Sequence, residues 1–284
     1  MGAKFGPAGN SESFALKGYK HSLQVPLYLT EMGLDHFEYQ CGRGVNVSEE
    51  KANQFGIAMK EKGLTVSLHA PYYISMSSVE EEKRLNSVNY ILQSARAVNA
   101  MGGDHIVVHT GSCSKISREE ALSLASDTMR IALDALKAEN LGHIHICPET
   151  MGKINQLGTL EEVIALCKID ESIIPCIDFG HLNARTMGEI KGKEDFENIL
   201  LTIENKLGID RLKVFHSHFS KIEYTTGGEK RHLTFEDTVF GPDFEPLMEL
   251  VYKKNLSPVF VCESAGTQAE DALAMKKYYN LLGK

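Results

Sequence analysis

Histidines and acidic residues stand directly after short apolar runs in several widely separated parts of the sequence. His69, His109, Glu149, Asp178 and Glu263 each occupy such a position. Imidazole nitrogens and carboxylate oxygens are ligands that zinc accepts, and manganese suits sites in which oxygen ligands dominate. If the fold brings the ends of these runs together, the sequence therefore predicts a metal centre.

A single histidine at the end of a strand usually has only a structural role, so the prediction depends on the whole set. His181 lies three positions after Asp178, and His216 ends a further apolar run. Several carboxylates in one water-poor place repel each other strongly, and bound cations are the simplest way to remove that repulsion. Histidines without such support are left out of the set: His21, His36, His105, His143 and His145.

Eight short runs rich in β-branched and aromatic residues alternate with longer stretches of helical period. The runs end near Gly6, Gln40, His69, His109, Glu149, Asp178, His218 and Glu263. Helices are expected at about 49–62, 118–139, 160–168, 194–207, 243–254 and 268–282. The even spacing predicts one (β/α)8 TIM barrel over residues 1–284, in which the C-terminal ends of all strands meet on one face. A doubly wound open sheet is less favoured, because such even units leave no second domain.

Three helix starts carry the pattern of a capping box, in which two side chains accept the free backbone N–H groups of the first turn. The pairs are Ser77 with Glu80, Ser117 with Glu120, and Thr159 with Glu162. Behind the first pair, apolar residues recur at steps of three and four as far as Met101. This predicts a further helix, with one apolar stripe for packing on the barrel.

The composition is that of a folded globular chain, with 43% hydrophobic and 24% charged residues. No apolar run reaches the roughly 18 to 20 residues that span a bilayer, so we expect a cytoplasmic location without membrane contact. The formal net charge of −8 argues against non-specific binding to a polyanion. The cysteines stand singly, without metal-binding spacing, and nothing indicates an obligate protein partner.

Through these residues and the segments around them, the chain resembles the endonuclease IV family of apurinic/apyrimidinic endonucleases, within the larger group of xylose-isomerase-like barrels. The matching segments are SLHAPY at 67–72, VHTGS at 108–112, PETMG at 148–152, LGT at 157–159, CIDFGH at 176–181, FH at 215–216 and CE at 262–263. They follow the order of the family's motifs over almost the whole chain.

The resemblance implies a trinuclear zinc site that hydrolyses the DNA backbone on the 5′ side of an abasic nucleotide. The ligands implied are His69, His109 and Glu149 for the first ion, Asp178, His216 and Glu263 for the second, and His181 and His232 for the third. In such a site paired metals lower the pKa of a shared water, and Glu149 or Glu263 could handle the proton. We therefore expect two or three Zn²⁺ ions, with Mn²⁺ as an alternative.

One part of the third metal site departs from the family pattern. The family has Asp-x-His after the seventh strand, whereas aligning on His232 puts Lys230 at the Asp position. A charged lysine cannot ligate a metal. Either Glu229 substitutes through a one-residue shift, or His218 reaches over from the seventh strand, or the third metal is absent or weaker.

The residues that would contact DNA match the family less closely. Tyr72 stands where the family has a tyrosine that wedges at the lesion, and an aromatic ring can stack on exposed bases. In the loop after the second strand only Gln40 and Arg43 resemble the family's Asn-Gln-Arg run. Cations placed in or near the loops of the same face, and able to neutralise phosphates, include Arg185, Lys221 and Arg231. The expected partner is DNA that contains abasic sites.

Two other functions remain open at this point. A divalent-metal sugar isomerase or epimerase of the same barrel group needs two carboxylates and one histidine around its metal. The additional histidines His109, His181 and His216 exceed that requirement, so this function ranks second. The third possible function is to bind damaged DNA without cleaving it. Lys230 at the family's Asp position and the changed loop after the second strand suggest this function.

Overall fold

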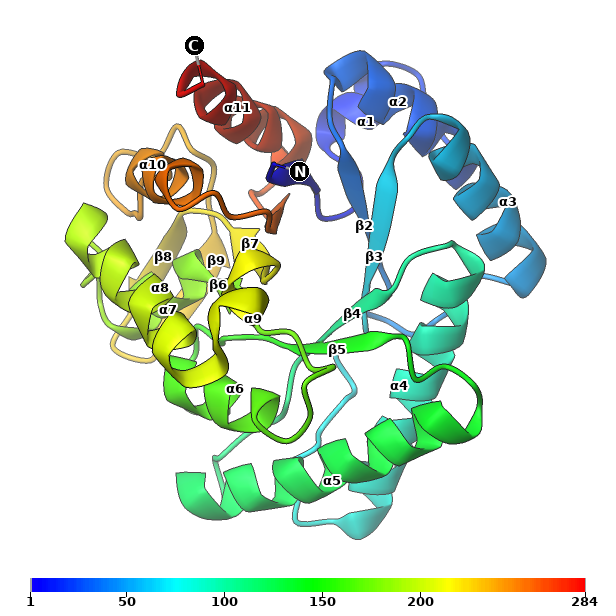
Figure 1. Ribbon diagram of the computed structural model, residues 1–284, viewed down its shortest axis with the longest axis vertical. Helices are drawn as coiled ribbons and strands as arrows, with labels where there is room; N and C mark the ends of the chain where they lie inside the picture. The colour runs from blue at the N-terminus through cyan, green and yellow to red at the C-terminus, as the bar shows by residue number, and fades with distance from the viewer. Residues whose placement is uncertain (1, 284) are drawn as a thin grey trace.

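The computed structural model describes residues 2–283, and its parallel strands close into a barrel (Figure 1). Hydrogen-bonded strands follow the orders β1-β10-β7-β6 and β2-β3-β4-β5. Single bridges from Ala8 to Glu38 and from Glu149 to Cys176 complete the ring. The barrel strands are β1 (Lys4–Pro7), β2 (His36–Gln40), β3 (Thr65–His69), β4 (His105–Val108), β5 (His145–Pro148), β6 (Cys176–Asp178), β7 (His216–Phe219) and β10 (Val259–Cys262). The predicted TIM barrel is confirmed, and the open sheet is wrong.

Helices surround the ring of strands in Figure 1. Those at predicted places are α3 (Glu49–Glu61), α4 (Glu81–Ala100), α5 (Arg118–Ala138), α6 (Leu160–Cys167), α8 (Lys193–Leu207), α10 (Glu245–Lys253) and α11 (Gln268–Leu281). The unpredicted elements are α1 (Glu12–Leu16), η1 (Ser22–Gln24), α2 (Val25–Met32), α7 (Phe179–Arg185), α9 (Ile209–Lys213) and a hairpin of β8 (Ile222–Thr225) and β9 (Gly228–His232). Within residues 2–283, no helix combines the length and the apolar character needed to cross a membrane.

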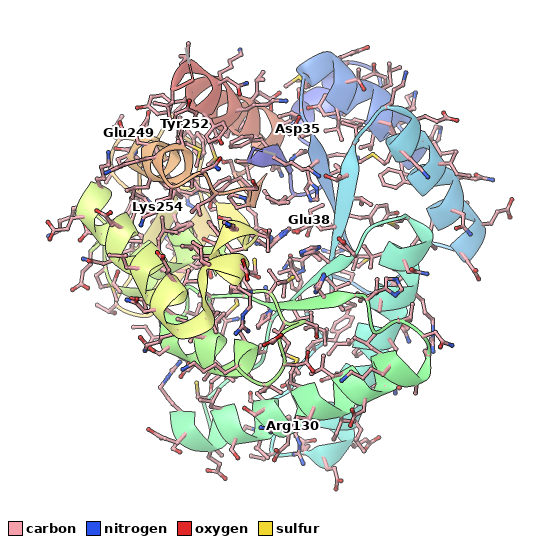
Figure 2. All side chains as sticks on the ribbon, in the orientation of Figure 1. Asp35, Glu38, Arg130, Glu249, Tyr252 and Lys254 are labelled. Carbon is pink, nitrogen blue, oxygen red and sulfur yellow. The ribbon has the colours of Figure 1, made fainter. Side chains whose placement is uncertain are left out.

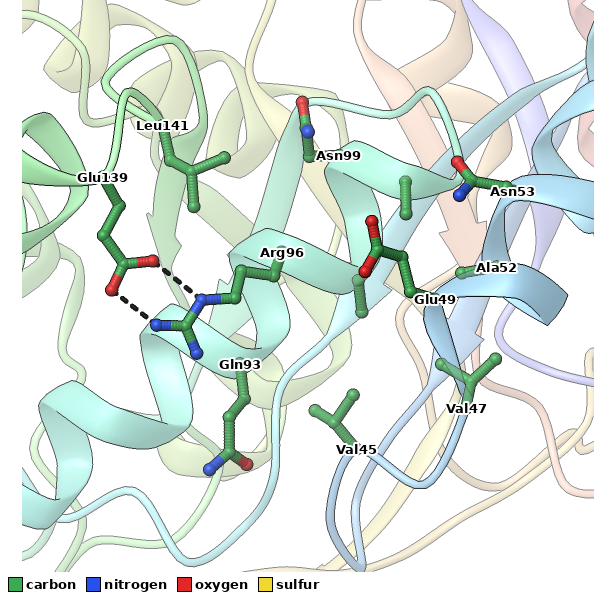
Figure 3. Close-up of a pocket in the computed structure, with 12 residues that line it drawn as sticks. Val45, Val47, Glu49, Ala52, Asn53, Gln93, Arg96, Asn99, Glu139 and Leu141 are labelled. Atoms are coloured by element: carbon green, nitrogen blue, oxygen red, sulfur yellow. Dashed lines mark hydrogen bonds and ion pairs between the residues drawn. The ribbon is translucent and has the colours of Figure 1, made fainter.

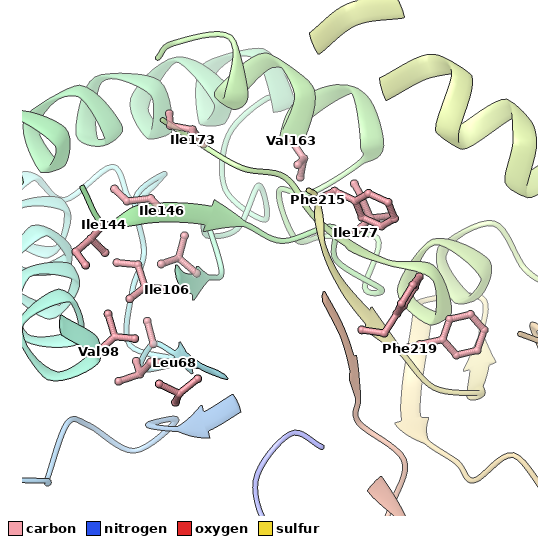
Figure 4. Close-up of a cluster of buried hydrophobic side chains, with 14 of the residues drawn as sticks. Leu68, Val98, Ile106, Ile144, Ile146, Val163, Ile173, Ile177, Phe215 and Phe219 are labelled. Carbon is pink, nitrogen blue, oxygen red and sulfur yellow. The ribbon is translucent and has the colours of Figure 1, made fainter. Parts of the chain in front are cut away.

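Apolar side chains fill the layer between the strands and the surrounding helices (Figure 4). Leu68, Ile106 and Ile146 from three neighbouring strands are fully buried there, together with Val98 of α4. Burying a side chain of this size contributes roughly 1.5–3 kcal/mol. Alternate residues of a strand point to opposite faces, so His69, next to Leu68, points into the barrel. The packing of the outer layer thus fixes the strand ends at which the candidate ligands stand.

Two of the three predicted helix caps form. Thr159 and Glu162 make the complete box at the start of α6, and the side chain of Ser117 accepts the N–H of Glu120 at the start of α5. The prediction for Ser77 is wrong, because α4 begins four residues later. Instead, the Ser77 hydroxyl donates to the carbonyl of Ser112 and accepts its N–H, both at 2.8 Å. Ser77 therefore ties together the loops that follow β3 and β4.

Candidate metal centre

A first group of candidate ligands lies at the ends of three neighbouring strands. His69 is the last residue of β3, and His109 and Glu149 directly follow β4 and β5. The Nε2 atom of His69 lies 3.5 Å from Glu149 Oε2, and the Nε2 atom of His109 lies 3.1 Å from the same oxygen. The Nδ1 atom of His69 bonds to the carbonyl of Ala70 at 2.9 Å, which directs Nε2 towards Glu149. The structure thus brings together the residues expected to hold the first ion.

A second group shares Glu149 with the first. It consists of Glu149, Asp178, His218 and Glu263, whose candidate ligand atoms all lie within 4.8 Å of one another. One oxygen of Asp178, Oδ1, accepts the N–H of His181 at 2.6 Å and caps α7. The other oxygen, Oδ2, is left to bind a metal. His218 Nδ1 lies 3.1 Å from Glu149 Oε1 and 3.6 Å from Glu263 Oε2. These four residues could hold a second ion.

The expected second-metal ligand His216 is replaced by His218 in this group. Residue Asp178 pairs with His218 across β6 and β7, whereas His216 pairs with Cys176. His216 therefore lies one layer lower in the barrel, where its Nε2 donates to Glu38 at 2.8 Å. Residues two apart on a strand point the same way, so His216 and His218 both face into the barrel. The length of β7 decides which of them reaches the mouth.

Glu38 of β2 lies beneath the centre and was missed by the sequence analysis. Figure 2 shows it towards the middle of the barrel. Its Oε1 lies 2.9 Å from His218 Nε2, and its Oε2 also accepts the hydroxyl of Ser67 at 2.9 Å. Burial favours the neutral acid, but the charges and hydrogen bonds of His218 and His216 hold the pKa of Glu38 well below its usual range. The sequence signal that could have revealed Glu38 is its position as the only acidic residue of the strand segment HFEYQ.

A third group combines residues of a helix and of the hairpin with Glu263, which directly follows β10. His181 of α7 and His232 of β9 lie together with Glu263. Glu229 joins them, with its Oε2 at 3.4 Å from His181 Nε2 and its Oε1 at 3.8 Å from His232 Nε2. His181 Nδ1 bonds to the carbonyl of Thr150 at 3.0 Å, which directs its Nε2 towards Glu229. Of the alternatives for the missing family Asp, the geometry favours Glu229.

A β-bulge explains how Glu229, rather than residue 230, points into the mouth. Glu223 pairs with Arg231 and Tyr224 pairs with Glu229, so Lys230 is the extra residue on its strand. Across a bulge, residues three apart can point to the same side. Lys230 and Arg231 both turn outward onto Glu223, with 2.6 Å contacts. The bulge therefore directs Glu229 and His232 to the mouth and removes Lys230 from it.

The donor set fits bound cations. Glu149 Oε2 and Asp178 Oδ2 are buried without a hydrogen-bond partner among residues 2–283, although almost all buried polar atoms in proteins have one. The nitrogens of His69 and His109 approach Glu149 Oε2 without the direction of a hydrogen bond. Unpartnered carboxylate oxygens among imidazole nitrogens are the arrangement that divalent metals complete.

Electrostatics in the metal-free chain show the same need for positive charge. Burial lowers the pKa of His181, but the carboxylates of Asp178 and Glu149 outweigh it and raise that pKa to about 10. Burial raises the pKa of Asp178 to about 6. The carboxylates thus favour the protonated form of His181 when no cation is bound. Metal binding would supply this positive charge instead and release that proton.

The three groups open into a hollow of about 430 Å³ at the barrel mouth. Tyr72 lies on its rim, 57% exposed, with its ring stacked at 5.2 Å on that of His109. Lys153, Gln156 and Met151 also line the hollow and were missed by the sequence analysis. A separate groove of about 500 Å³ lies between α3 and α4, beside the ion pair of Arg96 and Glu139 (Figure 3), and none of the candidate ligands lines it.

Two of the cations expected to contact DNA are already occupied. The Arg185 guanidinium donates four hydrogen bonds to backbone carbonyls of residues 151–156. Lys221 is 8% exposed and donates to the carbonyl of Asp237 at 2.7 Å, with Asp243 at 2.8 Å. Both predictions are corrected, because neither side chain is free to reach a phosphate. Arg43 and Arg231 are exposed, although Arg231 is paired with Glu223.

Comparison with known protein families places this geometry in a class. Residues 27–278 match the family described as xylose isomerase-like TIM barrel. Because the match covers most of the chain, the protein belongs to this family. Its members share the barrel and the mouth at the C-terminal strand ends, where catalytic residues of TIM barrels stand.

Two relatives of this chain match most of its length. An uncharacterized protein of Methanocaldococcus jannaschii is 35% identical over 255 residues, covering 89% of this chain and 90% of that protein. A probable endonuclease 4 of Acholeplasma laidlawii is 30% identical over 203 residues, covering 68% of this chain and 66% of that protein.

Solved structures show the same fold at lower identity. The crystal structure of a D-tagatose 3-epimerase-like protein has a TM-score of 0.74 at 18% identity, covering 99% of this chain and 98% of that one. Endonuclease IV from Thermus thermophilus has a TM-score of 0.65 at 17% identity, covering 98% of each chain. The fold is therefore shared by epimerases and endonucleases.

Proposed function

We propose that this protein is a metal-dependent phosphodiesterase that cleaves the DNA backbone on the 5′ side of abasic sites. The third ligand group carries the proposal. A single metal held by carboxylates and one histidine would use only the second group, whereas His181, Glu229 and His232 add a further site beside it. Additional metals suit phosphate hydrolysis, in which both the attacking and the leaving oxygen need stabilisation.

The residues present would hold two or three Zn²⁺ ions, with Mn²⁺ as the alternative. His69, His109 and Glu149 would hold one, and Glu149, Asp178, His218 and Glu263 the next. His181, His232 and Glu229 would hold the third. When bound, such ions lower the pKa of a water molecule and neutralise charge on a phosphate.

Other side chains at the mouth would position the substrate and move protons. Glu263 is 15% exposed and lines the hollow, so its carboxylate can accept a proton from an incoming water. The exposed ring of Tyr72 can stack on a sugar or base at the lesion. Lys153, which also lines the hollow, can donate to a phosphate oxygen. Bound dications would make the mouth locally positive, so the chain's net negative charge does not exclude DNA.

A sugar isomerase or epimerase is the second candidate. The observation in its favour is that Glu149, Asp178, His218 and Glu263 form a complete oxygen-rich set without the other groups. Oxygen-rich sets suit Mn²⁺ or Mg²⁺. The third group has no role in this reaction.

The deciding experiment presents both substrates to the metal-loaded protein. We expect a synthetic duplex with one abasic site to be cut on the 5′ side, no turnover of ketoses, and loss of cleavage after chelation. Epimerisation without DNA cleavage would replace the proposal with the second candidate. Binding of abasic DNA without metal-dependent cleavage would leave only a recognition role.

A further inference from the structure

The loop that follows β5 is held by two arginine side chains. Arg185 of α7 donates from Nη1 to the carbonyls of Met151 and Lys153, at 2.6 and 3.0 Å. Its Nη2 donates to those of Ile154 and Gln156, both at 3.1 Å. Hydrogen bonds from a charged donor are stronger than neutral ones, and the planar guanidinium fixes the directions of all four.

Arg118, at the start of α5, holds the same loop from the other side. It donates to the carbonyls of Ile154 at 2.9 Å and Gln156 at 3.0 Å. Its Nε and Nη2 also bond to the carboxylate of Glu162 at 2.6 and 2.7 Å. Glu162 is itself fixed in the capping box of α6. The arginine clamp, formed by Arg118 and Arg185, thus ties the 151–156 loop to three helices.

The clamped loop in turn supports the hairpin that carries Glu229 and His232. Glu229 donates its N–H to the carbonyl of Gly152 at 3.1 Å, and Ile154 donates to Gly227 at 3.1 Å. An antiparallel bridge pairs Lys153 with Gly228. A two-stranded hairpin is only marginally stable alone. The loop therefore helps to hold the hairpin at the mouth, together with the packing of β8 and β9 on α7.

Gly152 brings the loop close to the third ligand group itself. A Cβ at this position would lie 2.6 Å from Glu229 Cβ and 2.8 Å from His181 Cδ2. Only a glycine allows the loop, the hairpin and α7 to approach this closely. His181 and Arg185 also lie four residues apart on α7, so one helix supplies a ligand and fastens the loop.

We infer that Arg118, Arg185 and Gly152 are positioning residues that set the geometry of the third ligand group, His181, Glu229 and His232. The inference rests on the metal centre of the proposed function but not on its DNA substrate. It gives Arg185 a role different from the phosphate contact expected from the sequence.

The first test measures hydrogen exchange in the metal-free protein. In Arg185→Met, the amides of Glu229 and Ile154 should exchange faster by roughly tenfold or more, because the loop loses four hydrogen bonds. The matched control is Arg96→Met, which removes an exposed ion pair on α4 and should leave both amides unchanged. Equal exchange at both amides in Arg185→Met and in the unaltered protein would overturn the inference.

The second test counts metals by chelator competition. Gly152→Ala should weaken the weakest-bound Zn²⁺ by about tenfold to hundredfold and leave the tighter ions in place. The control is Gly192→Ala, where a Cβ meets no atom within 4 Å. Unchanged binding of every ion, or equal weakening of all, would contradict the inference.

The two tests separate this inference from the proposed function. If both give the expected shifts and abasic DNA is not cut, the positioning role stands and the substrate proposal fails. If DNA is cut but neither variant shows its shift, the positioning role fails alone.

Discussion

The first and third ligand groups use similar side chains on very different supports. His69 and His109 stand at the ends of β3 and β4, which are paired with neighbours inside the barrel. Glu229 and His232 stand on a hairpin outside the barrel, which reaches the mouth through the clamped 151–156 loop. The first group is thus fixed by the core of the fold, and the third by the packing of the hairpin on α7 together with the clamped loop. We expect tight metal binding in the first group and weaker binding in the third.

The largest effect should follow a change at Glu149, which belongs to both the first and the second group. Glu149→Gln replaces the carboxylate that the two groups share by a neutral amide, so both candidate sites would lose a ligand at once. We expect DNA cleavage to fall by orders of magnitude while circular dichroism shows an intact fold. A near-normal rate in a folded variant would remove Glu149 from the centre.

Removing one histidine from each group tests whether the two supports differ in metal binding. His69→Ala should lower total metal content and abolish cleavage, since it breaks the strand-borne group. His232→Ala should lose only the weakest ion and retain the others. Elemental analysis of the two purified variants measures this directly. The same loss in both would mean that the two supports do not differ in function.

A smaller effect is expected at Glu38, which contacts His218 without reaching the mouth. Glu38→Gln removes the negative charge that orients the His218 ring, so metal affinity should fall about 10- to 100-fold. The readout is competition with a chelator, and Ser67→Ala, which removes a hydrogen bond to the same carboxylate, should have a weaker effect. An unaltered affinity in Glu38→Gln would limit Glu38 to packing.

The smallest effect is expected at the rim. Tyr72→Ala removes a ring that can stack on an exposed base or sugar, a contact worth about 1–3 kcal/mol. Binding to abasic duplex should therefore weaken more than binding to intact duplex, as measured by fluorescence anisotropy. Equal weakening on both duplexes would make Tyr72 a packing residue for His109.

The strand-borne part of the centre could be predicted from the sequence. His69, His109, Glu149 and Asp178 follow buried runs, and the closing of a barrel brings such strand ends together. The second-metal ligand was assigned to His216 because the FH segment at 215–216 resembles the family motif, although the run itself ends near His218. Glu38 was missed because one acid within a strand reads as a solvent-facing residue until the barrel closes around it.

The hairpin-borne part could be predicted only as a choice between alternatives. The position of Glu229 depends on a bulge at Lys230, and sequence spacing does not reveal a bulge. Arg185 and Lys221 were expected at phosphates because cations in loops are usually exposed. The structure shows instead that carbonyls and an acid satisfy them, and such partners come from distant parts of the chain.

Anomalous diffraction from crystals of the zinc-loaded protein would locate the bound ions directly. We expect a peak among His69, His109 and Glu149, a second among Asp178, His218 and Glu263, and a weaker third beside His181, Glu229 and His232. An empty mouth at saturating zinc, with these side chains bonded only to one another, would show that they do not form a metal centre.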